Sequence, residues 1–492
     1  MDKPTLAFAI VVLMLSGCSR AENYEPAGRP HETIPRAEAD AAKPGDRQVA
    51  APPDEVAAPP DEVASLDVPA PVEEAESAAE SDALPADSPA DNAVPDPTAP
   101  YWPAFQGPRG DNKSSETGLL KQWPDGGPPL LWTAQGIGEG YSSVSLAHGL
   151  IYTAGNLDGN TVVTAFDLDG QVRWQVPAGD AWTRGYPGTR STPTIDGDRL
   201  YYQNPLGELY CLRAATGERI WNVPVLERFD APIITWALAE SSLIDGNRVI
   251  STPGGRQTAV VALDKMTGDI VWQSESAEGD AAGYATPTVA EYRGKRLLFT
   301  MTAKAVICVD ADTGQLYWRF PHETSHDVNV LKPIFHEGHV FVSTGYGSGS
   351  RMLRVLVDGD QVGVEEVWFN SDLDNHHGGV VLIDGYLYGS RHRRDWACLE
   401  WETGRTVYME PGVGKGSLTY ADGMLYTLSE RGEMGLVPPT PDGHEVVSRF
   451  QLPPQGKGMS WAYPVVVGGR LYIRHGDYLY CYDVRDPAAP AP

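Results

Sequence analysis

A short phrase that returns along the chain and ends in an aromatic residue constrains the fold more than any other feature of this sequence. Its copies are AFDLDGQVRW (165–174), CLRAATGERIW (211–221), ALDKMTGDIVW (262–272), CVDADTGQLYW (308–318) and a weaker one, CLEWETGRTVY (398–408). Each copy reads as a strand, a tight turn at glycine and a second strand closed by the aromatic residue. A phrase that recurs at this period indicates a repeat architecture.

The spacing of the closing aromatic residues predicts a β-propeller. These residues are Trp132, Trp174, Trp221, Trp272, Trp318, Trp368, Tyr408 and Phe450. Their gaps of 40 to 51 residues match the roughly 40–50 residues of a four-stranded blade. Three strands remain after Phe450, and one strand at 130–132 is spare, so joining the two ends of the chain completes an eighth blade. We therefore predict an all-β, eight-bladed β-propeller closed by N- and C-terminal strands, with seven blades as the main alternative.

The N-terminus has the features of a targeting segment. An apolar run at 6–15 is too short to span a bilayer and follows Lys3. It ends in Leu-Ser-Gly-Cys, which resembles the lipobox of bacterial lipoproteins, in which Cys18 would be lipidated. An ordinary secretory signal with a chance cysteine is the alternative. Position 19 is serine and not the aspartate that resembles an inner-membrane retention signal. This difference favours the outer membrane.

The segment that follows is predicted to be a disordered tether. Between residues 20 and 100 the chain is rich in Ala, Pro, Asp and Glu, and it duplicates the heptad APPDEVA at 51–64. Such a composition cannot bury enough apolar surface to offset the entropy of ordering. The predicted organisation is a signal peptide (1–17), a tether (18–100), a propeller (101–485) and a flexible tail (486–492). The net charge of −28 excludes a nucleic-acid partner, which would need a basic footprint.

The remaining cysteines are predicted to be free. Cys211, Cys308, Cys398 and Cys481 occupy the place in the phrase where other copies have alanine, and they fall in alternate repeats. Neighbouring units therefore should not bring two of them together. Small buried thiols are favoured over disulfide bridges, although an even number in an exported chain invites the latter.

The repeated phrase resembles the tryptophan-docking repeat of pyrroloquinoline-quinone-like (PQQ-like) propellers, from Trp102 to Asp483. The opening segment 102–132 and NHHGG at 375–379 look like those of exported planctomycete proteins of this family. The chain also resembles the propeller lipoprotein of the outer-membrane β-barrel assembly machine. Its lipobox makes it more similar to that lipoprotein than to the soluble dehydrogenases. The resemblance implies that the tryptophans are structural and dock between blades.

Quinoprotein alcohol dehydrogenases of this family carry an Asp base, a Ca²⁺ held by Glu and Asn, and in many members two adjacent cysteines. This chain has no Cys-Cys pair, and no segment matches the calcium ligands residue by residue. No catalytic residue is therefore assigned, and no cofactor is firmly implied. A quinone cofactor with Ca²⁺ is expected only if the protein is a dehydrogenase, which is the alternative function.

Polar residues at the starts of the repeat units are the candidate ligand-binding residues. In a propeller these loops lie at the mouth of the central channel, where aromatic, cationic and amide side chains can form a pocket. The candidates are Arg184, Arg190, Trp236, Asn375, His376, His377, Lys415 and Trp461. The alternative, equally weighted, is that these groups satisfy one another and trapped water.

Three short segments are not predicted to form a metal site or a further ligand site. Adjacent histidines on one strand would point to opposite faces, so His376 and His377 are not predicted to share a metal ion. The turns GYGSGS (345–350) and RHRR (391–394) are interpreted as a flexible connection and a solvated hairpin turn.

The function favoured by the sequence is a binding or assembly scaffold, anchored in the membrane and facing the periplasm. Its expected partners are the membrane, through the lipid anchor, and envelope proteins or peptides. The alternative is a PQQ-dependent alcohol dehydrogenase with its site in the central channel.

Overall fold

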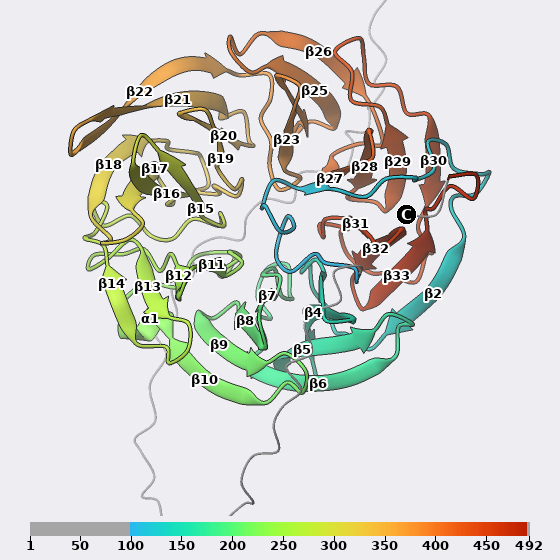
Figure 1. Cartoon of the computed structure of the whole chain (residues 1–492), viewed down its shortest axis with the longest axis horizontal. Helices are drawn as coiled ribbons and strands as arrows, with labels where there is room; N and C mark the ends of the chain where they lie inside the picture. Colours follow the sequence, from blue (N-terminus) through green and yellow to red (C-terminus); the bar gives the residue numbers. More distant parts are fainter. Residues whose placement is uncertain (1–98, 490–492) are drawn as a thin grey trace, which may run out of the picture. The chain divides into compact units, whose positions relative to one another are not determined.

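The computed structural model describes residues 99–489, and almost all of its regular structure is β-strand. Eight four-stranded blades surround a central axis, with the first strand of each blade innermost, and the short β1 (Lys113–Ser114) adds a fifth strand to one of the eight sheets (Figure 1). The predicted signal peptide, the lipobox Cys18 and the predicted tether lie outside the described residues. No helix among residues 99–489 is long and apolar enough to cross a membrane.

Blades 1 to 4 follow one another along the chain. Blade 1 contains β3 (Ser145–Ala147), β4 (Leu150–Leu157), β5 (Asn160–Asp167) and β6 (Val172–Asp180). Blade 2 contains β7 (Thr194–Asp196), β8 (Arg199–Gln203), β9 (Glu208–Arg213) and β10 (Arg219–Pro224), followed by the single-turn helix α1 (Val225–Arg228). Blade 3 contains β11 (Leu243–Asp245), β12 (Arg248–Ser251), β13 (Val261–Asp264) and β14 (Ile270–Gln273). Blade 4 contains β15 (Thr288–Tyr292), β16 (Lys295–Met301), β17 (Ala305–Asp310) and β18 (Leu316–Pro321).

The remaining blades complete the ring. Blade 5 contains β19 (Ile334–His336), β20 (His339–Thr344), β21 (Gly349–Asp358) and β22 (Gln361–Asn370). Blade 6 contains β23 (Val380–Ile383), β24 (Tyr386–Ser390), β25 (Asp395–Glu400) and β26 (Thr406–Pro411). Blade 7 contains β27 (Gly416–Ala421), β28 (Met424–Ser429), β29 (Glu433–Val437) and β30 (Ser448–Gln451). Blade 8 contains β31 (Val465–Val467), β32 (Arg470–His475), β33 (Tyr478–Asp483) and the early strand β2 (Leu130–Gln135).

Blade 8 confirms the predicted closure of the ring. Strand β2 pairs antiparallel with β33, and Trp132 lies directly opposite Cys481. The same pairing recurs in the phrase of other blades, for example Ala165 with Trp174 and Cys308 with Trp318. The residue opposite the closing aromatic is thus alanine or cysteine in each phrase copy, whereas Met352 lies opposite Trp368 and Met434 lies opposite Phe450.

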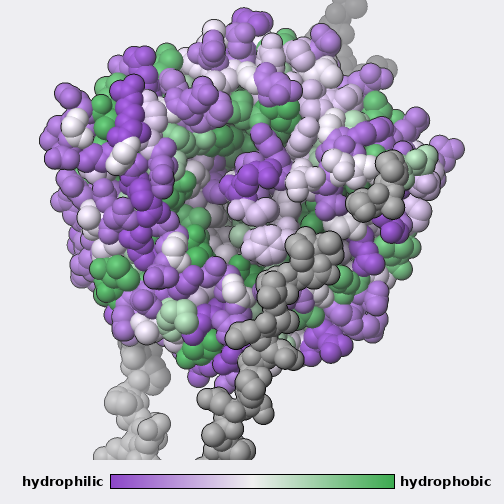
Figure 2. All heavy atoms as spheres, in the orientation of Figure 1, coloured by the Kyte–Doolittle hydropathy of each residue, from purple (hydrophilic) through white to green (hydrophobic). Residues whose placement is uncertain are grey.

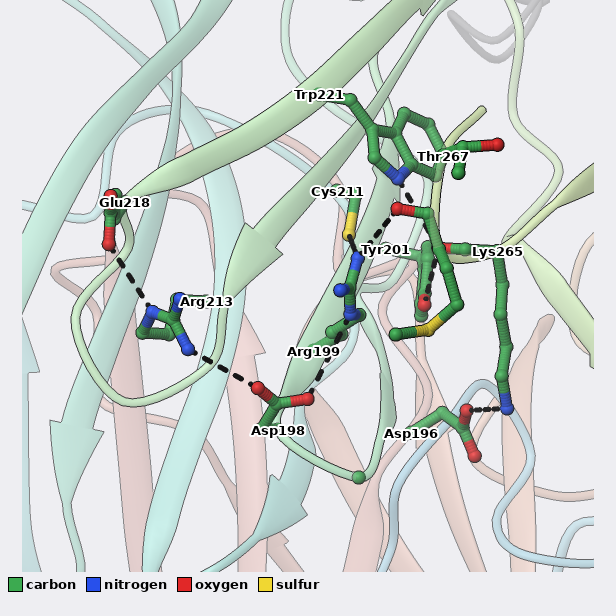
Figure 3. A network of polar contacts seen from close by, with 12 residues as sticks. Asp196, Asp198, Arg199, Tyr201, Cys211, Arg213, Glu218, Trp221, Lys265 and Thr267 are labelled. Atoms are coloured by element: carbon green, nitrogen blue, oxygen red, sulfur yellow. Dashed lines mark hydrogen bonds and ion pairs between the residues drawn. The ribbon is translucent and has the colours of Figure 1, made fainter. Parts of the chain in front are cut away.

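The tryptophan of the phrase docks onto the next blade, as the family resemblance implies. The indole N–H of Trp174 donates to the carbonyl oxygen of Ala214 at 3.1 Å, and that of Trp272 donates to Ala311 at 3.2 Å. Figure 3 shows the equivalent contact between blades 2 and 3, where Trp221 and Tyr201 both donate to the carbonyl of Lys265. Burying a large aromatic side chain stabilises a fold by roughly 1.5–3 kcal/mol.

The four cysteines within the described residues are free and buried, as predicted. Burial raises the pKa of the Cys398 and Cys481 thiols to about 12. They are therefore packing residues rather than reactive thiols.

A strap closes one end of the channel. Residues 102–114, here called the strap, run across the middle of the ring in Figure 1 and end in β1 (Lys113–Ser114), which pairs parallel with β27. Trp102 exchanges two backbone hydrogen bonds with Leu146 of blade 1. At the other end, Thr419 of blade 7 donates to the side-chain oxygen of the buried Asn112. The ends of the strap thus contact blades 1 and 7, the two blades that flank blade 8.

A cavity of about 810 Å³ remains beside the strap, lined by strap residues and by inner strands of blades 2 to 6. Figure 2 shows this face hollowed near its middle, with apolar side chains bordering the hollow. Lys332 lies in the cavity wall and donates from Nζ to the carbonyl of Gly110 at 2.9 Å. Burial lowers the pKa of Lys332 to about 8, although Asp111 acts in the opposite direction.

Candidate functional site

The opposite end of the channel carries a continuous cluster of aromatic, histidine and charged side chains. In a four-stranded antiparallel blade, the loop entering the first strand and the turn between the second and third strands lie at the same face. The cluster draws on both kinds of loop, and we call it the mouth cluster. Its members are Tyr141, Tyr186, Arg190, Trp236, His326, Tyr346, His376, His377, His392, Lys415, Glu430 and Trp461.

A chain of ring contacts runs around the mouth. Trp236 contacts Tyr186 (ring centroids 5.7 Å apart), Tyr186 contacts Trp461 (4.9 Å), and Trp461 contacts His377 (5.3 Å). The chain continues from His377 to His376 at 5.1 Å. These rings come from loops that enter blades 2, 3, 6 and 8, so the cluster exists only in the closed ring.

Tyr346 extends the chain on the other side of the mouth. Its ring centroid lies 5.0 Å from that of His376, 4.4 Å from that of His392 and 4.7 Å from that of His326. Tyr346 belongs to the turn between β20 and β21, and His392 to the turn between β24 and β25.

Glu430 is the electrostatic centre of the mouth cluster. One carboxylate oxygen, Oε1, lies 2.9 Å from Nε2 of His377, 3.1 Å from Nζ of Lys415 and 2.8 Å from the indole nitrogen of Trp461. Burial alone would raise the pKa of Glu430, but His377, Lys415 and Trp461 together lower it far below its usual range. Glu430 therefore stays ionised at neutral pH and holds three candidate residues in place.

Three histidines of the mouth, His376, His377 and His392, are neutral at neutral pH. Burial and the nearby Lys415 lower the pKa of His376, His377 and His392, and for His377 these effects outweigh the opposing Glu430. The Nδ1 atoms of all three imidazoles are buried and have no hydrogen-bond partner. Buried polar atoms normally find partners, so three unpartnered nitrogens in one cluster leave hydrogen-bonding capacity for a ligand.

Two aromatic residues of the mouth are both exposed and conformationally strained. Tyr186 is 43% exposed with φ of 52°, and Tyr346 is 39% exposed with φ of 58°. Bulky residues rarely adopt this left-handed region, which costs of order 1–3 kcal/mol each. Strain of this kind concentrates at ligand-binding sites, where the surrounding structure enforces it.

The structure places six of the eight sequence candidates in this cluster. His376, His377, Lys415 and Trp461 are joined through Glu430 or through ring contacts, Trp236 is joined through Tyr186, and Arg190 lies 5.6 Å from the ring of Tyr141. Tyr141 itself contacts Trp461 in a tilted arrangement with ring centroids 4.6 Å apart.

The other two candidates make different contacts. Arg184 is exposed and lies over the ring of Trp182 at 4.5 Å. Asn375 is fully buried, and its amide donates to the carbonyls of Gly379 and Ser390. Asn375 therefore shapes the loop that carries the histidines and does not itself face a ligand.

Two interpretations of the sequence are corrected. His376 and His377 precede β23 in an irregular segment, so they do not alternate across a strand, and their rings lie near each other. Residues 391–394 do form a hairpin turn, but His392 is half-buried against Tyr346, and Arg391 pairs with Asp395 at 3.2 Å. This turn is not simply solvated, because it lies over the mouth of the channel.

Sequence reasoning missed Glu430, Tyr346 and His392, which all lie in turns between second and third strands. Polar turns between short strands usually face solvent, so nothing local distinguishes these three. The available signal is topological: once the blades are assigned, these turns must share a face with the loops that enter the first strands.

The donor set of the mouth differs from a calcium-assisted quinone site. Oε1 of Glu430 already accepts from three donors, and the buried Asp374 beside the cluster accepts from the backbone N–H groups of Gly347 and His392. A further carboxylate, Glu240, is buried in the loop before β11 and accepts from Ser251 and the backbone of Thr252. Within residues 99–489, no three His, Cys, Asp or Glu residues are grouped to hold a metal ion. The residues present therefore do not fit the Asp base and the Glu and Asn ligands of the dehydrogenases.

The fold and the docking contacts define an eight-bladed propeller of the PQQ-like class. A family model described as outer membrane protein assembly factor BamB matches residues 159–410, just over half of the chain. The chain belongs to this family.

Solved structures and a curated relative are similar to this chain at low identity. BamB from Moraxella catarrhalis is 15% identical with a TM-score of 0.53, covering 74% of this chain and 99% of that one. A quinohemoprotein alcohol dehydrogenase from Comamonas testosteroni is 12% identical with a TM-score of 0.56, covering 80% and 82%. At these identities the likeness shows the fold alone.

The quinoprotein ethanol dehydrogenase of Pseudomonas aeruginosa is 28% identical over 165 residues. That alignment covers 31% of this chain and 26% of the dehydrogenase, so the chain spans about a quarter of the length of this relative. The family thus includes relatives named as an assembly factor and relatives named as enzymes.

Proposed function

We propose that this protein is a binding scaffold of the bacterial cell envelope, and that its mouth cluster holds peptide segments of other envelope proteins. The observation that carries this proposal is the pair of exposed, strained rings, Tyr186 and Tyr346, set around a half-buried and charge-compensated Glu430. Exposed aromatic rings beside unpartnered polar atoms are typical of surfaces that bind peptides. Membership of a family described by an assembly factor supports the same function.

The proposal includes the position of the protein in the cell. The lipobox at Cys18 would anchor the chain in a membrane, and the absence of the retention signal favours the outer membrane, with the propeller facing the periplasm. Pro100 lies against Gly468 on the strap face, so the described chain begins at the end of the channel opposite the mouth cluster.

The alternative is a PQQ-dependent alcohol dehydrogenase, favoured by the stretch that is 28% identical to a quinoprotein ethanol dehydrogenase. The carboxylates of the mouth do not supply the ligands and base that such an enzyme needs, as described above. Incubation with the quinone and Ca²⁺ tests this alternative. A stoichiometric bound chromophore with dye-linked alcohol oxidation would favour the enzyme over the scaffold.

Binding of short aromatic peptides, followed by tryptophan fluorescence, tests the scaffold. Tyr186→Ala should weaken binding at least tenfold, because aromatic anchors at the centre of an interface carry most of its affinity. Tyr101→Ala is the matched control, since Tyr101 is 55% exposed but belongs to the strap end of the chain. Equal binding by the wild type and Tyr186→Ala would contradict the proposal.

A further inference from the structure

Two polar groups in the cavity beside the strap, here called the strap-side cavity, are buried without a full set of partners. Lys332 is 8% exposed, and its Nζ donates to the carbonyl oxygen of Gly110 at 2.9 Å. Within residues 99–489, the other two donors of this ammonium have no acceptor. The Oγ of Ser242, in the same wall, is buried and has no hydrogen-bond partner among the described residues. Buried polar groups normally find partners, so the wall has hydrogen-bonding capacity left for a ligand.

The positive charge of Lys332 is not compensated by the acidic residues of the wall. Each of the three carboxylates that line the cavity within residues 99–489 is ion-paired with a different cation. The pairs are Asp111 with Arg109, Asp196 with Lys265, and Asp245 with Arg296. Burial lowers the pKa of Lys332 only to about 8, so the amine stays mostly protonated at neutral pH. A buried ammonium without a counter-charge is costly, and an anion in the cavity would offset that cost.

The strap is shaped to hold this ammonium in place. Gly110 has a backbone φ of +62°, and a Cβ on it would overlap Nζ of Lys332. Glycine is therefore favoured at this position both by the backbone conformation and by the close approach of the amine. The strap thus fixes where the ammonium lies in the cavity wall.

The rest of the wall favours a ligand with an aliphatic body. Partly exposed aliphatic side chains come from the innermost strands of blades 3 to 6, namely Leu243, Ile244, Val289, Ile334 and Leu382. The two aromatic rings of the wall already contact other rings, Phe105 that of Tyr463 and Phe335 that of Phe299. Apolar side chains also border the hollow on this face in Figure 2. The volume of about 810 Å³ is in the range of small-molecule sites.

We propose that the strap-side cavity binds an unbranched alkyl carboxylate, with the carboxylate on Nζ of Lys332 and the chain against the aliphatic wall. The charge-assisted hydrogen bond compensates the buried ammonium. The alkyl chain removes the apolar surface of the wall from water. The cavity lies at the end of the channel opposite the mouth cluster, so this site is independent of the peptide binding proposed above.

Isothermal titration with dodecanoate and with dodecanol tests the contact with the head group. The full chain carries Cys18→Ala in every measurement, so that no detergent competes for the cavity. With Lys332 present, dodecanoate should bind about ten- to hundredfold more tightly than dodecanol, because the alcohol lacks the charge. Lys332→Met should abolish that preference, and Lys332→Arg should keep part of it. Lys113→Met, which removes the half-buried lysine of the same wall, should leave the preference intact.

A series of acids from hexanoate to dodecanoate tests the contact with the aliphatic wall. Affinity should rise about three- to fourfold for each added CH₂, because each one buries further apolar surface. Acetate or inorganic phosphate binding as tightly as dodecanoate would overturn the proposal, since the cavity would then hold only a small anion.

Reductive methylation locates the site without a substitution at Lys332. Mass spectrometry should show that saturating dodecanoate protects Lys332 from the reagent, while the exposed Lys457 stays modified. Unchanged labelling of Lys332 would place the ligand elsewhere and overturn the proposal.

Two results of the titrations would also overturn the proposal. Failure of dodecanoate to bind would do so while leaving the scaffold function standing. An equal loss of preference in Lys113→Met and Lys332→Met would show that diffuse positive charge, not one ammonium, attracts the carboxylate. Thermal unfolding of Lys332→Met distinguishes a lost contact from a lost fold, and Lys332→Arg with the labelling provides the test if Lys332→Met does not fold.

Discussion

The indole nitrogen of Trp132 lies 3.0 Å from the carbonyl oxygen of Leu168, and this contact joins the first long strand of the chain to the first complete blade. Trp132 belongs to β2, which completes blade 8, whereas Leu168 follows β5 in blade 1. The contact therefore closes the ring with the same docking geometry that joins blade 1 to blade 2. Closure leaves no exposed sheet edge between the first and last blades.

The turn glycine beneath a docked tryptophan should be intolerant of alanine. A Cβ on Gly170 would lie 2.7 Å from the ring of Trp132, and the backbone φ there is +80°. Gly170→Ala should lower the free energy of unfolding by about 2–3 kcal/mol, measured by chemical denaturation. Gly159→Ala is the control, because Gly159 has the same φ but no atom within 4 Å, and it should cost only about 1 kcal/mol. Equal losses would mean that the docked ring does not constrain the glycine.

Membrane attachment is predicted to depend on Cys18. Lipidation at this residue would supply acyl chains sufficient for stable anchoring. Cys18→Ala should move the protein from the membrane to the soluble fraction on cell fractionation. Cys398→Ala, which alters a buried propeller thiol, should leave it with the membrane. Retention of Cys18→Ala in the membrane fraction would show that the lipobox was misread.

The fold could be predicted from the sequence because one contact is repeated. Where a tryptophan docks on a turn glycine of the next blade, as Trp132 does on Gly170, the same residue types recur at the same spacing in successive blades. The candidate site was predicted only in part. Trp461 and Lys415 lie in segments that enter innermost strands. The order of the strands alone was therefore enough to place them at the mouth of the channel. Glu430, which holds both, lies in a turn whose local sequence carries no sign of burial.

Glu430 should make the protein sensitive to acid. Its pKa in the folded state is held below the ordinary value of 4.5, so its stabilising contribution is fully present above that pH and is lost as the pH falls below it. Glu430→Gln should lower the free energy of unfolding by about 1–3 kcal/mol at pH 7, because Lys415 loses its counter-charge. The difference between wild type and variant should shrink below pH 4.5 in urea denaturation. Glu433→Gln, which breaks the exposed pair with Arg449, should cost less than about 1 kcal/mol.

Lys332 should give a pH dependence of the same sign as Glu430, but at alkaline pH. Its pKa in the folded state is about 8, below the ordinary 10.5, so the unfolded chain binds more protons between these values and stability rises with pH. Relative to Lys332→Met, the wild type should gain about 1–3 kcal/mol between pH 7.5 and pH 10.5 in urea denaturation. Lys332→Arg keeps its charge throughout this range and should also lack the gain. Parallel curves for the wild type and Lys332→Met would show that the amine beside Gly110 is not desolvated by the strap.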